Sequence, residues 1–220
     1  MSRLESDLHV AGNLTANSMT IPDNAVTNAS VIASAAIVRS KLAQTVLAEY
    51  PIELFLFRVW DAMQTNLPGT SAADDLGLIG GTFGSASPLL QTYDVKAAGA
   101  VTLRARVTIP VPIEYDAGET LTIRVRGGMT TTIADTSATV DIEAYRFDED
   151  GGVSADLCTT AAQSINSLTK ADKDFVVTPT TFNPGDQIDI RVTIAVTDAA
   201  TVGTVKATLS KLALLCDVRG

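Results

Sequence analysis

The residues that could carry out acid–base or nucleophilic chemistry are few in this sequence. Histidine occurs once, at His9, whereas these forms of catalysis usually use an imidazole positioned inside a folded site. His9 lies in an N-terminal stretch of small residues, where a structural or solvated role is favoured. A pair of carboxylates could still hydrolyse a glycosidic bond, but the acidic residues fall mostly in expected turns and on outward strand positions. We therefore expect the protein not to be an enzyme.

Two short stretches have compositions that are found at some ion-binding sites. The loop from Phe147 to Gly152 (FDEDGG) places three carboxylates before two glycines, and Ca²⁺ could use their oxygens. It lacks the full series of EF-hand ligands, which favours a solvated turn. The glycine-rich stretch 77–84 (GLIGGTFG) is not followed by an expected helix, as a phosphate-binding loop would require. The sequence thus predicts no metal and no cofactor.

The two cysteines bear on metal binding and disulfide formation, and the net charge bears on nucleic acid and membranes as partners. Cys158 and Cys216 match no metal-ligand spacing, and the polar opening MSRLESDLHV predicts no secretory signal. We expect both thiols to be reduced and packed, with a disulfide as the lesser alternative. The net charge of −9 and the absence of a basic run argue against nucleic acid and anionic membranes as partners. No run of 18 apolar residues predicts a membrane span.

From residue 51 onward the sequence predicts β-strands separated by turns. Four segments alternate apolar and polar residues with a period of two, which indicates a sheet with one buried face: 101–109, 121–126, 138–147 and 187–196. Five further segments are weaker candidates: 53–60, 76–83, 89–95, 174–179 and 204–218. Turn residues such as Asp116-Ala117-Gly118 and Asn183-Pro184-Gly185-Asp186 lie between them. We predict an all-β, jelly-roll-like antiparallel β-sandwich over residues 51–220.

One candidate strand, residues 53–60 (ELFLFRVW), is apolar at four successive positions. They are Leu54, Phe55, Leu56 and Phe57. A strand with two apolar faces is covered on both sides, by a second sheet or by another subunit. The segment is therefore a candidate subunit interface.

Residues 1–50 have a different composition, rich in Ala, Ser and Asn, and form an expected N-terminal arm. Large apolar residues recur about every fifth position, at Ile21, Val26, Val31, Ile37, Leu42 and Leu47. This spacing fits neither a strand nor a helix well, and the small spacers cannot form a core of their own. Three copies around a common axis could bury the apolar residues against one another. The alternative for residues 30–49 is an amphipathic helix capped by Ser30.

The stretch LHVAGNLTANSMTIPDNAVTNASVIASAAIVRSKLAQ (residues 8–44) resembles the N-terminal arms of tailed-bacteriophage surface proteins, namely head-decoration (cement) proteins and head or tail fibres. This resemblance implies a homotrimer with intertwined arms and a β-sandwich seated on the virion. It also implies the major capsid protein as partner and the outer head surface as location. The resemblance implies trimer or capsid contacts at eight apolar positions: Leu8, Val10, Leu14, Ile21, Val26, Val31, Ile37 and Leu42. Leu47 is added as a contact because it continues the five-residue spacing. Residues 51–220 resemble only the general jelly-roll type.

Five arginines share the outward face of their expected strands: Arg104, Arg106, Arg124, Arg126 and Arg191. Cross-strand ion pairs with outward acids such as Asp141, Glu143 and Asp189 would account for them. The alternative is that this face docks on an acidic capsid lattice or a neighbouring subunit.

The leading hypothesis is a trimeric capsid decoration protein that stabilises a phage head. The alternative is a fibre or spike head module that binds a host-surface receptor or glycan. Exposed aromatic residues would support that alternative, but aromatics make up only 5% of the chain, and Trp60 and Tyr93 are the main candidates. A glycosidase is the third hypothesis.

Overall fold

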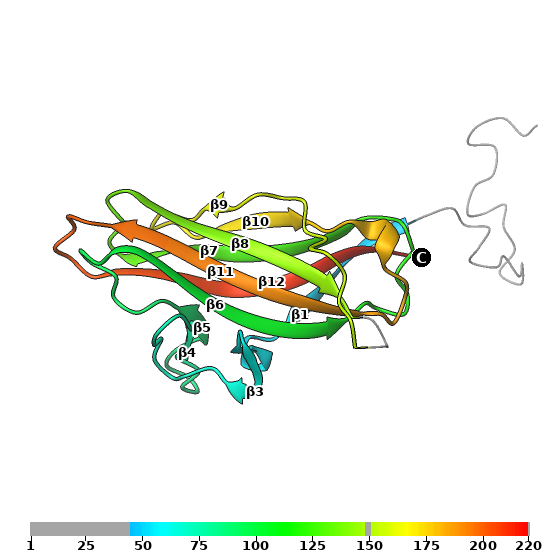
Figure 1. The fold of residues 1–220 in the computed structure, drawn as a ribbon, viewed down its shortest axis with the longest axis horizontal. Helices are drawn as coiled ribbons and strands as arrows, with labels where there is room; N and C mark the ends of the chain where they lie inside the picture. The colour runs from blue at the N-terminus through cyan, green and yellow to red at the C-terminus, as the bar shows by residue number, and fades with distance from the viewer. Residues whose placement is uncertain (1–44, 148–150, 220) are drawn as a thin grey trace, which may run out of the picture. The chain divides into compact units, whose positions relative to one another are not determined.

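The computed structural model describes residues 45–147 and 151–219, which form a β-sandwich (Figure 1). Twelve strands form two six-stranded sheets, and every pair of neighbouring strands is antiparallel. In these described ranges the only helical elements are two 3₁₀ turns, η3 (Leu54–Leu56) and η4 (Pro179–Thr181). The all-β, jelly-roll-like sandwich predicted from the alternating pattern is confirmed.

The first sheet, called sheet A, has the order β10-β7-β12-β5-β4, and β1 also pairs with β12. The second, called sheet B, has the order β3-β2-β6-β11-β8-β9. The strands of sheet A are β1 (Thr45–Ile52), β4 (Gly77–Ile79), β5 (Leu89–Gln91), β7 (Leu121–Thr131), β10 (Ala171–Val176) and β12 (Val205–Arg219). Those of sheet B are β2 (Arg58–Val59), β3 (Ala62–Asn66), β6 (Gly99–Pro110), β8 (Ser137–Arg146), β9 (Gln163–Ser164) and β11 (Gln187–Asp198).

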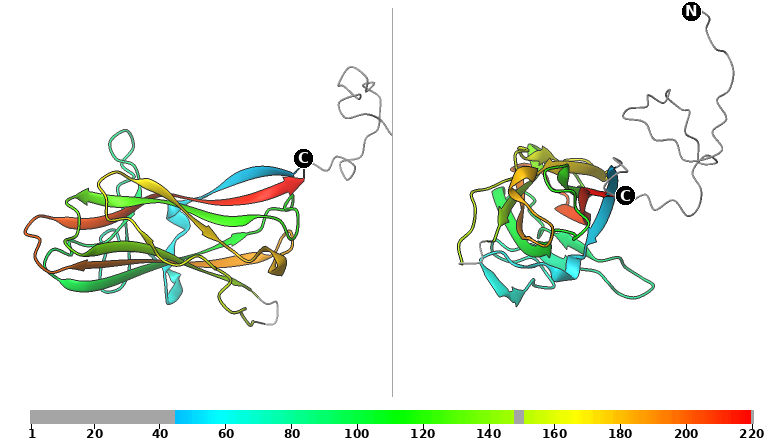
Figure 2. Two further views of the ribbon diagram at one scale, coloured as in Figure 1. Left: turned by 90° about the horizontal axis from the view of Figure 1, so that it is seen from above. Right: turned by 90° about the vertical axis from the view of Figure 1, so that its right-hand side faces the viewer.

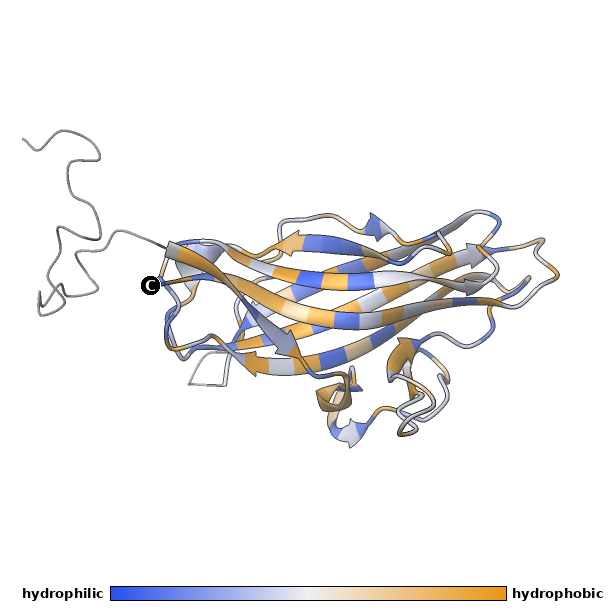
Figure 3. Ribbon diagram, turned by 180° about the vertical axis from the view of Figure 1, so that it is seen from behind, coloured by the Kyte–Doolittle hydropathy of each residue, from blue (hydrophilic) through white to orange (hydrophobic). Residues whose placement is uncertain are grey.

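The core lies between the sheets and is built from the alternating positions of the long strands. On β6, Leu103, Ala105 and Val107 are buried, while Arg104 and Arg106 between them are partly exposed. The same alternation runs along β8 and β11, and hydrophobic and hydrophilic segments alternate along the strands in Figure 3. The four strictly alternating segments therefore lie in β6, β7, β8 and β11, as predicted.

The turns that precede β7 and β11 were also predicted correctly. In the first, the N–H of Glu119 donates to the carbonyl of Asp116 at 3.0 Å. In the second, the N–H of Asp186 donates to the carbonyl of Asn183 at 3.1 Å. Gly118 and Gly185 have φ angles of 93° and 89°, a left-handed conformation that glycine adopts without steric cost.

The structure corrects three local predictions. Residues 53–60 are not one strand: η3 interrupts them, and only Arg58–Val59 form β2. Of the stretch 76–83, only Gly77–Ile79 form a strand. The helix given as the alternative for residues 30–49 is wrong at residues 45–49, which belong to β1; the rest of that range lies outside the described residues. Eight residues of β1 pair with β12, and such tertiary pairing overrides local helix propensity.

Candidate functional site

Five exposed apolar side chains lie on β1, on η3 and in the loop between β6 and β7, and together we call them the β1 surface. They are Val46 and Leu47 on β1, Phe55 and Leu56 on η3, and Ile113 in the loop between β6 and β7. Their exposed fractions run from 40% for Leu56 to 73% for Ile113. Side chains of this size contribute about 1.5–3 kcal/mol each when buried, so an exposed group of them is a candidate interaction surface.

A hollow of about 330 Å³ lies beside β1, and Leu56 is the residue of the β1 surface that lines it. Its walls come from β1, η3 and the proline-rich segment after β6: Tyr50, Pro51, Ile52, Leu56, Ile109, Pro110, Pro112, Glu114 and Leu214. Within the described residues β1 pairs only with β12, so its outer edge has no strand beside it (Figure 2). A free strand edge next to an apolar hollow can receive another chain.

The structure divides the predicted interface segment 54–57 into two roles. Leu54 and Phe57 point into the core and are 7% and 1% exposed, whereas Phe55 and Leu56 face solvent. Buried residues three apart are typical of a 3₁₀ turn, in which positions i and i+3 eclipse. Leu47, predicted as an arm contact, lies on β1 and is exposed. The other arm contacts lie outside the described residues: Leu8, Val10, Leu14, Ile21, Val26, Val31, Ile37 and Leu42.

The five arginines lie on two faces of the sandwich rather than one. Arg124 and Arg126 are on the outer face of sheet A, where β10 places an aspartate opposite each. Arg124 binds Asp174 through two hydrogen bonds of 2.7 Å, and Arg126 binds Asp172 at 3.0 Å. The hydrogen bonds from Arg124 lower the pKa of Asp174. Such partly exposed pairs contribute about 0–1 kcal/mol each.

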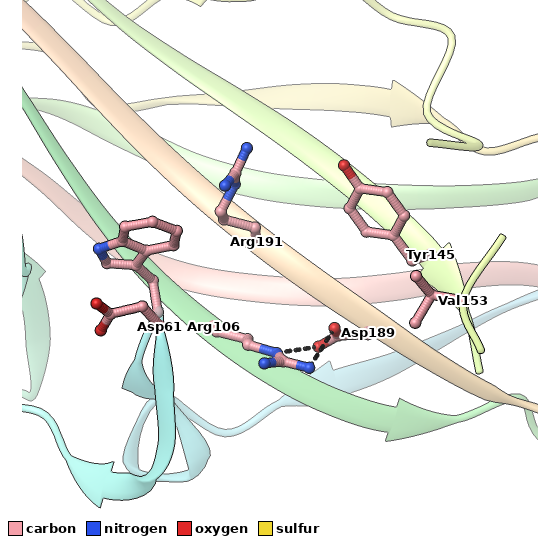
Figure 4. Close-up of a pocket in the computed structure, with 7 residues that line it drawn as sticks. Asp61, Arg106, Tyr145, Val153, Asp189 and Arg191 are labelled. Carbon is pink, nitrogen blue, oxygen red and sulfur yellow. Dashed lines mark hydrogen bonds and ion pairs between the residues drawn. The ribbon is translucent and has the colours of Figure 1, made fainter. Parts of the chain in front are cut away.

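The other three arginines lie on the outer face of sheet B, and each has an acidic partner. Arg106 of β6 binds Asp189 of β11 with two contacts of 2.7 Å (Figure 4). Arg191 of β11 donates hydrogen bonds to both carboxylate oxygens of Glu143 on β8. Arg104 lies 3.8 Å from Asp74. Glu143 and Asp189 were expected as outward partners, whereas Asp141 instead accepts the N–H of Ile142.

Trp60 lies against this face, a position that the sequence did not indicate. Its ring centroid is 5.1 Å from the guanidinium carbon of Arg104 and 5.4 Å from that of Arg191. The indole N–H donates to Asp74 at 2.9 Å. Because its arginine partners are 44 and 131 positions away in the chain, no local pattern could have joined them.

Both cysteines are free thiols, at separate places in the body. Burial raises the pKa of each thiol to about 11. The thiolate is the reactive form, so we expect both cysteines of the folded protein to react slowly with a disulfide reagent at pH 8. Unfolding in guanidinium should restore the rate of an ordinary thiol. Fast reaction of both thiols in buffer, followed by absorbance, would contradict this burial.

The ion-binding candidates give no site in the described part of the chain. No group of three or more His, Cys, Asp or Glu side chains is placed to hold a metal ion in that part. The acidic centre of the FDEDGG loop, residues 148–150, lies outside the described residues. After β4 the stretch 77–84 leads into a turn and then β5. No helix in the described ranges has the length and apolar character needed to cross a bilayer.

A scan against protein-family models finds no match, and neither does a search of curated proteins. Among solved structures, the chain is similar to the CBM22-1 xylan-binding domain of Paenibacillus barcinonensis Xyn10C, with 11% identity, a TM-score of 0.38, and coverage of 79% of this chain and 99% of that chain. It is also similar to the xylan-binding module CBM15, with 14% identity, a TM-score of 0.41, and coverage of 79% and 97%. A chain of infectious bursal disease virus, strain Gx, has 15% identity and a TM-score of 0.36 over 80% of this chain and 32% of its own. At these identities the likeness concerns the β-sandwich alone.

Proposed function

We propose that this protein is a structural protein of a virion, which forms a homotrimer and decorates the outer surface of a bacteriophage head by binding the major capsid protein. The observation that carries the proposal is the β1 surface. It includes the end of the expected arm (residues 1–50), since Val46 and Leu47 belong to that range and are exposed on β1. The resemblance of residues 8–44 to the arms of phage surface proteins supports the same assignment.

A second copy of the chain is the partner that fits the β1 surface. Leu47 belongs to the apolar spacing of the arm and is exposed on β1, so one interface can extend from the arm onto the body. Stable interfaces bury about 1,200–2,000 Å² in total, more than five side chains supply, and the arms would provide the rest. In a three-fold assembly each copy gives and receives the same contacts.

The proposed role is mechanical and involves no turnover. On the outer face of sheet B, Asp189 and Glu143 are held by arginines, which suits fixed ion pairs rather than proton transfer. A trimer that spans neighbouring capsid subunits would hold them together through repeated contacts, and three linked contacts raise avidity well above that of one.

Leu47→Asp tests the β1 surface as a contact between copies. We expect the variant to shift from trimer towards monomer in size-exclusion chromatography with light scattering, because a charge would be buried in an apolar interface. Val202→Asp is the matched control, since Val202 is 91% exposed in the loop between β11 and β12, away from β1. It should leave the mass unchanged. An unchanged mass for Leu47→Asp, or equal loss in both variants, would contradict the assignment.

Binding to phage heads tests the capsid partner separately. The purified full chain should bind mature heads of its parent phage at a fixed ratio and raise their resistance to heat. A trimer that binds no capsid form would reject the decoration role while leaving self-association in place.

A further inference from the structure

A groove of about 350 Å³ crosses the outer face of sheet B (Figure 4). Trp60 and Asp61 line it from the segment that follows β2, and Tyr145 lines it from β8. Between them, Arg106 of β6 and Arg191 and Asp189 of β11 line the groove. The groove uses none of the residues of the β1 surface.

Trp60 is held in one orientation by its surroundings. Its only polar atom, Nε1, already donates to Asp74, and two guanidinium groups lie within 5.4 Å of the ring centroid. A cation over an indole face is attracted by the electron-rich ring, which fixes the ring further. The indole is partly exposed and lines the groove, so it presents a preformed, mainly apolar surface to a ligand.

The polar side chains of the groove pair with one another and still have bonding capacity left. Arg106 uses Nε and one terminal nitrogen on Asp189, and Arg191 does the same on Glu143. A guanidinium has five N–H donors, so each keeps donors for a ligand, and each carboxylate keeps lone pairs. The Tyr145 hydroxyl donates to Glu143 at 3.2 Å. The side chain of Asp189 is 10% exposed, so its pair with Arg106 is a fixed part of the structure.

The groove carries no surplus of positive charge, because each arginine in or beside it has an acidic partner and Asp61 adds one further carboxylate. The three ion pairs are Arg106 with Asp189, Arg191 with Glu143 and Arg104 with Asp74. A phosphate or acidic ligand would gain no surplus of positive charge there. A purely apolar ligand would remove water from charged groups without replacing their hydrogen bonds, which is costly.

We propose that this groove binds a neutral oligosaccharide. The C–H face of a sugar ring would pack on the part of the Trp60 indole that the two guanidinium groups leave exposed, because its slightly positive hydrogens suit the negative face of an aromatic ring. The hydroxyl groups, each both donor and acceptor, would bond to the free N–H groups of Arg106 and Arg191 and to the carboxylates. Concave sites that combine an aromatic wall with a few fixed polar groups are typical for small ligands. This binding does not depend on trimer formation.

Trp60 is the only tryptophan in the chain, so intrinsic fluorescence reports directly on the groove. The full chain would be titrated with the neutral hexasaccharides xylohexaose, cellohexaose, mannohexaose and maltohexaose, and with hexagalacturonate as an anionic match. We expect a saturable change in Trp60 emission with at least one neutral hexasaccharide and none with hexagalacturonate. No response to any neutral hexasaccharide, or a response to hexagalacturonate alone, would overturn the proposal.

Two variants at Trp60 separate stacking from folding, with affinity measured by calorimetry on the neutral hexasaccharide that responds. Trp60→Ala should weaken binding by about tenfold or more, which corresponds to about 1.4 kcal/mol. Trp60→Phe keeps an aromatic ring and should weaken it less. Phe83→Ala removes a fully exposed aromatic ring from the loop between β4 and β5, outside the groove, and should bind as the wild type does. Thermal unfolding checks that each variant is folded, and unchanged affinity in folded Trp60→Ala would refute the site.

Discussion

The double variant Val26→Asp, Ile37→Asp is expected to run as a monomer in light scattering, and the wild-type chain is expected to run as a trimer. Both positions belong to the five-residue apolar spacing of the arm. If three copies bury these side chains, six apolar groups become six charges per trimer. Each lost burial removes about 1.5–3 kcal/mol, and repulsion between like charges on one axis adds to this.

The body of this double variant should stay folded. In the part of the chain that the structure describes, the core is formed by residues of the strands and loops from Ile52 onward. In thermal unfolding, the double variant should therefore show the transition of the folded body. A chain that lacks residues 1–44 supplies the reference midpoint for that transition. A trimeric mass for the double variant would show that the arm is not the main contact. A monomeric wild-type chain would refute self-association.

The sequence predicted the strands of the body well because their environment is regular. On β6 and β11, one face meets the core and the other meets solvent, so the alternation of Ile190 and Val192 with Arg191 records burial directly. The acidic partners of Arg106 and Arg191 could be predicted from the same alternation. Glu143 and Asp189 occupy outward positions on neighbouring strands, and the register places Glu143 opposite Arg191.

The predictions failed where distant segments decide the structure. β1 follows a stretch with helical spacing, yet its pairing with the C-terminal strand, more than 150 residues away, determines its conformation. In residues 54–57 four apolar residues suggested a strand, but the core accepts only Leu54 and Phe57. The groove could not be predicted either, because it depends on Trp60 lying next to Arg191, and these residues are far apart in the sequence.

Asp198→Asn is expected to destabilise the body more than any exchange at a surface ion pair. Asp198, at the end of β11, has no exposed surface, and its carboxylate accepts the N–H of Ala97 at 2.7 Å and that of Asp135 at 2.9 Å. These bonds tie the β5–β6 and β7–β8 loops to the end of β11. The amide of Asn would turn an NH₂ donor towards one of these N–H donors, which leaves buried groups unpaired. Asp172→Asn, on the outer face of sheet A, is the matched control and should lower the thermal midpoint much less.

The pH dependence of this effect follows from the pKa of Asp198. Burial alone would raise that pKa, but hydrogen bonds from Thr201, Asp135 and Ala97 outweigh burial and lower it. A carboxylate whose pKa is lower in the folded state stabilises the protein above its unfolded pKa of about 3.9, and this contribution is lost as pH falls through the folded pKa. The difference in thermal midpoint between wild type and Asp198→Asn should be largest near pH 7 and should shrink below about pH 4, where this carboxyl is protonated in the unfolded state but still charged in the folded state. A difference that stays constant down to pH 2 would mean that the charge of Asp198 does not hold these loops.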